Sequence, residues 1–178
     1  LEHLADPVGL LRDLRAAAGR RDGTPVYFEV PNGGHTLEGG GLWDLIYEHC
    51  HYFTPSSLQR AFLEAGFVVD SVEATFGGQF LTLHARALDR PATSRGIGDT
   101  GSPSTLRART EAFAERYRRT VDGWAARLAA FAGRAAPVAL WGAGSKGSTF
   151  VNVVPGAEAV STVIDINPRK QGAFVAGS

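Results

Sequence analysis

The sequence predicts an α/β protein built in two parts, each with its own sheet. Residues 1–88 show a helix, a strand, a helix and two strands at hairpin spacing. Residues 105–178 show a long helix, then a strand, a glycine-rich turn, a helix and a second strand, which is the order of a parallel βαβ unit. Residues 89–104 hold no periodic apolar pattern, so we expect a linker between the two parts.

Composition and charge exclude several classes of partner. The 178 residues carry 18 basic and 18 acidic side chains, so nothing in the net charge favours nucleic acid or an anionic membrane. No apolar run approaches the roughly 18 residues that span a bilayer. Cys50 is the one cysteine, which excludes an internal disulfide and fits a reducing compartment such as the cytoplasm.

The first part begins and ends its helices with standard signals. Asp6 and Pro7 open a helix as N-cap and first helical residue. Residues 26–30 form an apolar strand that stops at Pro31 and the glycines after it. Thr54 caps a second helix over Pro55–Ala65.

Two β-rich runs follow that second helix. They cover Phe67–Ala74 and Gln79–Ala87, and Gly77 with Gly78 joins them. This spacing predicts a β-hairpin. Together these elements form the second half of an α/β sheet whose first half is not in the sequence.

The second part combines a long helix with a βαβ unit. Ser104 is expected to cap a helix from Thr105 to about Ala132. A buried strand at 137–141 leads into the turn Gly142–Gly147, and a helix then runs through Val154. Residues 161–166 form the second strand, with Asp165 near its end.

The segment Trp43–Phe53 is the strongest candidate for a catalytic loop. It lies between three glycines and a helix cap, and it is dense in titratable and aromatic groups. His49 beside Glu48 suits a general base whose tautomer a carboxylate fixes. Tyr47 and Tyr52 are candidates to hydrogen-bond a substrate. Cys50 and His51 lack a second ligand cluster, so no metal site is expected.

Two further groups of residues are candidates for ligand binding. Glu2 and His3 would follow a strand end, where α/β folds place their ligands. Glycine spacing in the turn predicts phosphate binding at a helix N-terminus, with Lys146 adding a charge. Asp165 fits the ribose-binding carboxylate of a dinucleotide fold, so phosphate and dinucleotide interpretations both stay open. The proposed ligand-binding positions of the turn are Gly142, Gly144, Ser145 and Lys146.

These motifs resemble the three-domain sugar C-methyltransferases, which depend on S-adenosyl-L-methionine. Residues 1–7 are similar to the segment after the fourth strand of class I methyltransferases, and 26–32 to their fifth strand. The runs 48–54, 57–58 and 65–67 resemble the C-methyltransferase catalytic region. The turn 140–150 and the run 163–172 (Asp-Ile-Asn-Pro-Arg-Lys-Gln-Gly from Asp165) resemble that family's C-terminal domain.

The resemblance implies a fold and a reaction. The first part would be the back half of a class I methyltransferase Rossmann-like sheet, and the second a Rossmann-like βαβ domain. His49, with Glu48, would remove a proton alpha to the ketone of a nucleotide-linked deoxysugar. The family usually has tyrosine two residues before the Glu. Ile46 stands there in this sequence, with Tyr47 next to it, which leaves the substrate open.

The resemblance also implies that the chain is part of a larger polypeptide. The sequence has no methionine, and neither the family's zinc domain nor its glycine-rich cofactor loop is present. We therefore expect an additional N-terminal part as the partner of this chain, and little activity without it. An NAD(P)-dependent oxidoreductase or nucleotide-binding module, using Gly142–Gly147, is the alternative function.

Overall fold

The computed structural model describes residues 1–18, 23–39, 41–88, 102–132, 134 and 137–176. The chain forms two compact units. The N-terminal unit contains Leu1–Gly39 and Glu48–Arg109, and the C-terminal unit contains Gly40–Tyr47 and Thr110–Ser178. Most of the predicted linker, residues 89–101, lies outside the described residues.

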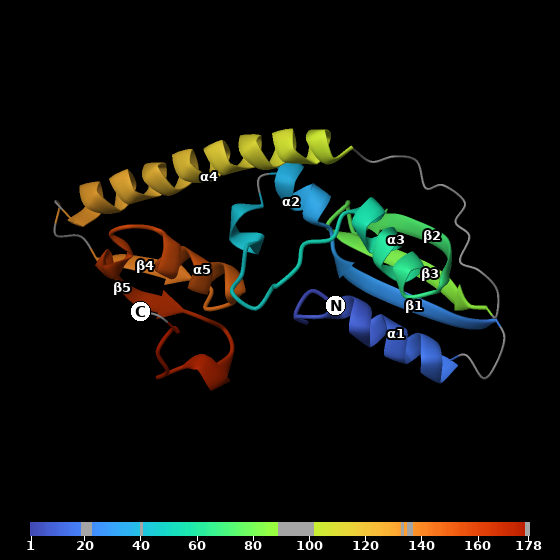
Figure 1. Cartoon of the computed structure of the whole chain (residues 1–178). Helices are drawn as coiled ribbons and strands as arrows, with labels where there is room; N and C mark the ends of the chain where they lie inside the picture. Colours follow the sequence, from blue (N-terminus) through green and yellow to red (C-terminus); the bar gives the residue numbers. More distant parts are fainter. Residues whose placement is uncertain (19–22, 40, 89–101, 133, 135–136, 177–178) are drawn as a thin grey trace. The chain divides into compact units, whose positions relative to one another are not determined.

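A three-stranded antiparallel sheet forms the N-terminal unit (Figure 1). Its strands are β1 (Thr24–Pro31), β2 (Val68–Thr75) and β3 (Phe80–Ala87). The last strand in sequence, β3, lies in the centre and pairs antiparallel with both others. The predicted hairpin is confirmed, and Gly77 and Gly78 adopt the positive φ angles of 67° and 91° that its turn requires.

Two helices of this unit begin as the sequence predicts. Helix α1 (Pro7–Ala18) starts where the Asp6 carboxylate accepts a 2.8 Å hydrogen bond from the Gly9 N–H. Helix α3 (Pro55–Glu64) starts at Thr54, which forms a reciprocal capping box with Ser57. These side chains satisfy N–H groups that a helix leaves unpaired.

A third helix, α2 (Gly33–Gly39), was not predicted. Its sequence contains three glycines, which are poor helix formers. Asn32 starts it: the Asn32 side chain accepts from the Gly34 N–H at 3.0 Å, and its carbonyl accepts from the Thr36 N–H at 3.1 Å. Local capping therefore overrides the weak helix propensity of the segment.

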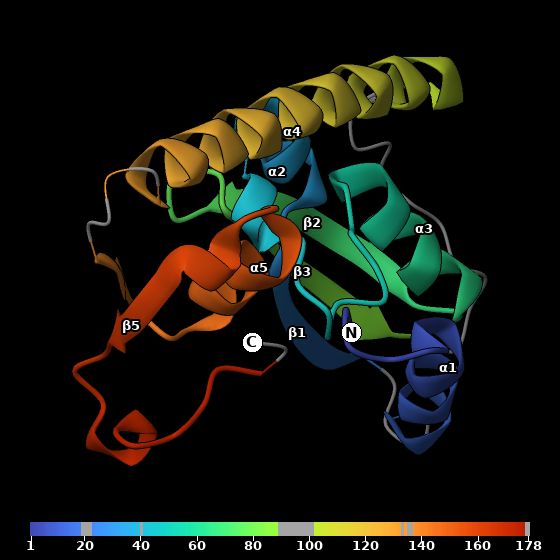
Figure 2. The same ribbon diagram turned by 90° about the vertical axis from the view of Figure 1, so that its left-hand side faces the viewer.

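The core of the N-terminal unit lies between α1, α3 and one face of the sheet (Figure 2). Alternate residues of β1 and β3 point into it, as period-2 strands require. Phe62 and Phe67 are fully buried, with ring centroids 5.5 Å apart. Among the described residues, the large aliphatic side chains that are fully buried are Leu11, Val30, Leu58, Leu81 and Leu83.

The C-terminal unit contains one parallel strand pair joined by a helix. Strand β4 (Val138–Trp141) leads to α5 (Ser145–Val153), and β5 (Val160–Ile164) pairs parallel with β4. The predicted order of strand, turn, helix and strand is thus present. The described residues of this unit also form three short 3-10 helices, η1 (Leu42–Asp44), η2 (Ala157–Ala159) and η3 (Pro168–Lys170).

The long helix α4 (Pro103–Ala132) begins two residues before the predicted start. Ser102, and not Ser104, is its cap, because the Ser102 hydroxyl accepts from the Thr105 N–H at 3.3 Å. Within the C-terminal unit, Leu128 of this helix packs with Val154 and Ala157. Trp43 and Phe150 pack against the same cluster.

Strand β4 differs from its prediction as a buried strand. Trp141 is 76% exposed, and burial along the strand only alternates between half-buried and exposed residues. Within the described residues this sheet has two strands, and the face that carries Ala139 and Trp141 is exposed. Among the described helices, none is both long and apolar enough to cross a membrane.

Candidate functional site

The N-terminal unit brings the start of the chain against the predicted catalytic loop. The carbonyl of Glu2 accepts hydrogen bonds from the backbone N–H groups of Cys50 at 2.7 Å and His51 at 3.2 Å. These bonds fix the backbone of residue 2 beside the loop. Glu2 and His3 therefore lie beside His49, which follows them by more than 40 positions in the sequence.

The ring of His3 has a defined orientation in this cluster. Its Nδ1 lies 3.0 Å from the Glu48 carbonyl oxygen, which can only accept a hydrogen bond. The Nδ1 atom therefore carries the proton, and Nε2 faces the Glu2 carboxylate at 3.7 Å from Oε1. The His3 and His49 rings meet edge to face, with centroids 4.8 Å apart.

Glu2 is a partly buried carboxylate with an altered pKa. Burial opposes its ionisation, but hydrogen bonds from its own backbone N–H and the Leu1 amino group outweigh burial and hold the pKa below its ordinary value. The Leu1 nitrogen lies 3.1 Å from Oε2. Glu2 is therefore anionic at neutral pH, beside two imidazole rings.

The far end of the loop is anchored to the end of β1. The Phe53 carbonyl accepts from the Gly33 N–H at 2.7 Å, and a Cβ at Gly33 would lie 3.1 Å from that same oxygen. Only a residue without a side chain fits here comfortably. This anchor places the Tyr52 ring 5.8 Å from the His49 ring, centroid to centroid, with Tyr52 40% exposed.

The side chains of Glu48 and Tyr47, two residues predicted for catalysis, make no described contact with the Glu2–His3–His49 cluster. Glu48 contacts His3 through its backbone carbonyl, and its side chain is exposed. Tyr47 is 100% exposed and belongs to the segment that groups with the C-terminal unit. His3 makes the ring contact with His49, although the sequence suggested only a ligand-binding role for it.

The glycine-rich turn of the C-terminal unit has a tight backbone. Gly142 adopts φ 103°, and its N–H donates to the Ile164 carbonyl at 2.7 Å. A Cβ on Gly147 would clash with the Gly142 carbonyl oxygen. The spacing of these glycines thus reflects close packing between the turn and α5, whose N-cap is Gly144.

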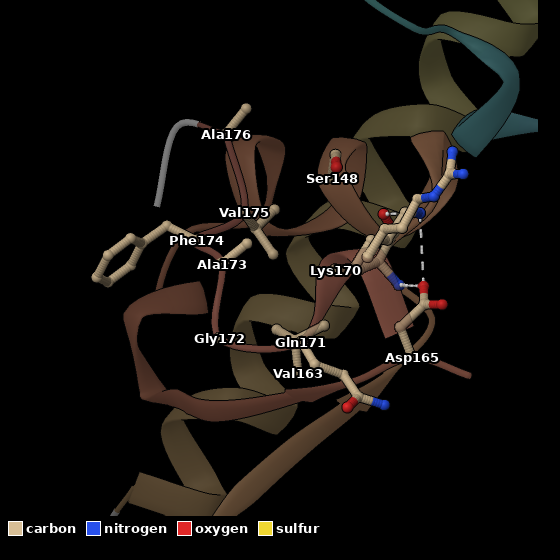
Figure 3. Close-up of a pocket in the computed structure, with 12 residues that line it drawn as sticks. Ser148, Val163, Asp165, Lys170, Gln171, Gly172, Ala173, Phe174, Val175 and Ala176 are labelled. Carbon is tan, nitrogen blue, oxygen red and sulfur yellow. Dashed lines mark hydrogen bonds and ion pairs between the residues drawn. The ribbon is translucent and has the colours of Figure 1, made fainter. Parts of the chain in front are cut away.

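Asp165 holds this turn in place (Figure 3). Its carboxylate accepts 2.8 Å hydrogen bonds from the N–H groups of Ala143 and Asn167. Those two hydrogen bonds are the main cause of an Asp165 pKa below the ordinary value. Lys170 donates to the Ala143 carbonyl at 2.8 Å and lies 3.5 Å from the Asp165 carboxylate.

A pocket of about 260 Å³ opens beside the turn. Ala143, Ser148, Arg169 and Lys170 are among its lining residues. Lys146, the basic residue predicted to serve this turn, instead forms a 2.8 Å ion pair with Asp44. The prediction missed Arg169 and Lys170 as groups of this site, although both belong to the run after Asp165 that the sequence marked as distinctive.

The comparison with known families bears on the N-terminal unit. Residues 1–72 match the family model described as a methyltransferase domain. The match covers less than half of the 178 residues but includes the whole Glu2–His3–His49 cluster. That family uses S-adenosyl-L-methionine, so the match implies methyl transfer to an acceptor. A search of curated proteins finds no match to the chain.

Proposed function

We propose that this chain supplies the acceptor side of a methyltransferase that uses S-adenosyl-L-methionine, with His49 as the catalytic base. One observation carries the proposal. Inside the region that matches the methyltransferase family, the His49 ring lies 4.8 Å from the His3 ring and 5.8 Å from the Tyr52 ring, centroid to centroid. A base needs this combination of a held ring and neighbouring polar groups.

His49 would remove a proton from a carbon next to a ketone. The proton passes to the imidazole, and the C–H electron pair stays on the substrate as an enolate. The Tyr52 O–H would donate a hydrogen bond to the substrate oxygen that gains negative charge, and this kind of stabilisation lowers such barriers. We also propose that, once substrate is bound, Glu48 fixes the tautomer of His49 and Tyr47 hydrogen-bonds the substrate.

The side chains of Glu2 and His3 suit a cationic cofactor. Glu2 carries a partly buried carboxylate, which suits the positive sulfonium and ammonium groups of S-adenosyl-L-methionine. We assign Glu2 and His3 to its binding. When bound, this cofactor supplies an electrophilic methyl group to the substrate carbon and leaves as the neutral thioether.

A nucleotide-linked keto-deoxysugar is the substrate class that we propose. Support comes from the likeness of 48–54 and 165–172 to the sugar C-methyltransferases and from two cations, Arg169 and Lys170, that line the pocket beside the turn. We assign the phosphates to Gly142, Gly144, Ser145 and Lys146, at the N-terminus of α5. The βαβ unit would then be a Rossmann-like domain for the substrate.

Substitution of His49 tests the proposal. In the polypeptide that carries residues 1–178, His49→Asn should reduce methyl transfer to a nucleotide-linked keto-sugar by about 10²–10⁴-fold. Affinity for S-adenosyl-L-methionine, measured by calorimetry, should change little. His51→Asn is the matched control, because its ring stacks on Phe53 instead of joining the cluster. A wild-type rate in His49→Asn would show that another group is the base.

A further inference from the structure

The C-terminal unit contains a second cavity, larger than the pocket beside the glycine-rich turn. It measures about 640 Å³, which is within the range of small-molecule sites. Strand β5, the start of η2 and the segment 173–175 form its walls. The aliphatic residues that line it are Val151, Ala157, Val160, Val163, Ala173 and Val175. A flat, weakly polar part of a ligand would lose its contact with water here, which favours binding.

The two cavities of this unit share one wall. Val163 and the segment 173–175 line both the larger cavity and the 260 Å³ pocket beside the turn. Arg169 and Lys170 line only the smaller pocket, and no basic residue lines the larger cavity. A ligand that occupies both would therefore place its anionic part on one side of this wall and its apolar part on the other.

Phe174 belongs to the shared wall and has an exposed ring. Its side chain is 96% exposed, and it points away from Lys170 and Asp165 (Figure 3). Stacking against a flat partner would remove apolar surface of this ring from water. Aromatic side chains bind nucleobases in this way, with little preference between the bases.

The free edge of β5 adds polar groups to the larger cavity. Among the described strands β5 pairs only with β4, and its four consecutive residues 160–163 line the cavity. The outer edge of a strand presents backbone N–H and C=O groups. These groups can hydrogen-bond the polar edge of a base whose face stacks on an aromatic ring.

We propose that the larger cavity binds the nucleobase of the nucleotide-linked substrate, with the Phe174 ring stacked on the base. This inference rests on the proposed function, which assigns the substrate's phosphates to the glycine-rich turn. In a nucleoside diphosphate, one ribose joins the anionic diphosphate to the flat base. Two adjacent cavities, one with cations and one with aliphatic walls, match these two parts of the ligand.

Calorimetry on the whole 178-residue chain tests the inference. The probes are the diphosphates of adenosine, cytidine, guanosine, thymidine and uridine, together with inorganic pyrophosphate. At least one nucleotide should bind more tightly than pyrophosphate. Phe174→Ala should weaken that nucleotide by about 5–150-fold, the effect of losing one stacked base, and leave the affinity for pyrophosphate unchanged.

Two further variants control for the role of the ring. Phe174→Trp keeps an aromatic face and should bind the nucleotide like wild type. Phe131→Ala removes another exposed ring of the same unit, one that lines neither cavity, and should also bind like wild type. Lys146→Ala, by contrast, should weaken pyrophosphate and the nucleotide alike, because it acts on the phosphates.

The outcomes separate this inference from the proposed function. Nucleotide affinity that is unchanged in Phe174→Ala, or equal to that of pyrophosphate in wild type, would overturn the nucleobase site and leave the phosphate assignment intact. If neither pyrophosphate nor any nucleotide binds, the phosphate assignment fails and the nucleobase site fails with it.

Discussion

The Asp165 carboxylate accepts a 2.8 Å hydrogen bond from the backbone N–H of Ala143, 22 positions earlier in the chain. In a dinucleotide-binding fold, the acidic residue at this place in the sequence binds the ribose of the cofactor. Here both Asp165 oxygens accept from backbone N–H groups, of Ala143 and of Asn167. The carboxylate therefore stabilises the turn, and this engagement argues against a nicotinamide-dependent function for the unit.

The role of Asp165 predicts a pH dependence of stability. Its pKa is lower in the folded chain than in the unfolded chain, so its contribution is present above the unfolded value of about 4 and is lost as the pH falls through the folded value. Asp165→Asn should remove this part of the acid sensitivity, measured by thermal unfolding between about pH 2.5 and 6. Glu158→Gln, an exposed carboxylate in the same unit, controls for charge alone. Identical pH profiles for wild type and Asp165→Asn would contradict the assignment.

Nucleotide binding by the C-terminal unit should depend on its lysines. We expect calorimetry to show weak binding of a nucleoside diphosphate and none of NAD. Lys146→Ala should weaken it, and Asp44→Asn should strengthen it, because Asp44 engages the Lys146 ammonium at 2.8 Å. Micromolar affinity for NAD that requires Asp165 would instead support the oxidoreductase alternative.

Gly147 should tolerate no side chain. The Cβ of Gly147→Ala would clash with the Gly142 carbonyl oxygen, which is backbone and cannot rotate away. We expect a loss of about 1–3 kcal/mol in the free energy of unfolding, measured by urea titration. Gly144→Ala is the control, since a Cβ there meets no atom within 4 Å. Equal losses in both variants would contradict the close approach as the cause, because alanine has the higher helix propensity.

The aromatic core of the N-terminal unit should dominate its stability. Phe62 is fully buried and contacts Phe28 and Phe67, with ring centroids 5.0 Å and 5.5 Å away. Phe62→Ala should cost about 3–5 kcal/mol in the free energy of unfolding. Phe76→Ala, at a side chain 70% exposed, should cost far less in the same urea titration. A small loss at Phe62 would place the main core elsewhere.

Elements with strong local signals were predictable from the sequence. Thr54 with Ser57, and Asp6 with Gly9, are caps whose hydrogen bonds lie within four residues, so the sequence contains the whole interaction. Gly77 and Gly78 specify their turn in the same way. Helix α2 escaped prediction because its cap, Asn32, acts on a segment whose glycines read as a loop.

The arrangement of the candidate site depended on contacts that span the chain. His49 was identified from the loop alone, but its contact with His3 depends on hydrogen bonds from residues 50 and 51 to Glu2. No pattern in the sequence fixes such a pairing. The ion pair of Lys146 with Asp44 is another contact that its place in the glycine-rich turn does not reveal.

The membership of Gly40–Tyr47 in the C-terminal unit limits how this protein can be dissected. The Trp43 ring packs on Phe150, with centroids 5.4 Å apart, although the candidate catalytic loop continues from it into the other unit. A recombinant product ending at residue 88 would carry a tryptophan without its packing partner, and one starting at residue 105 would lack both Trp43 and Asp44. Each half, expressed alone, should therefore show a red-shifted tryptophan emission or reduced solubility.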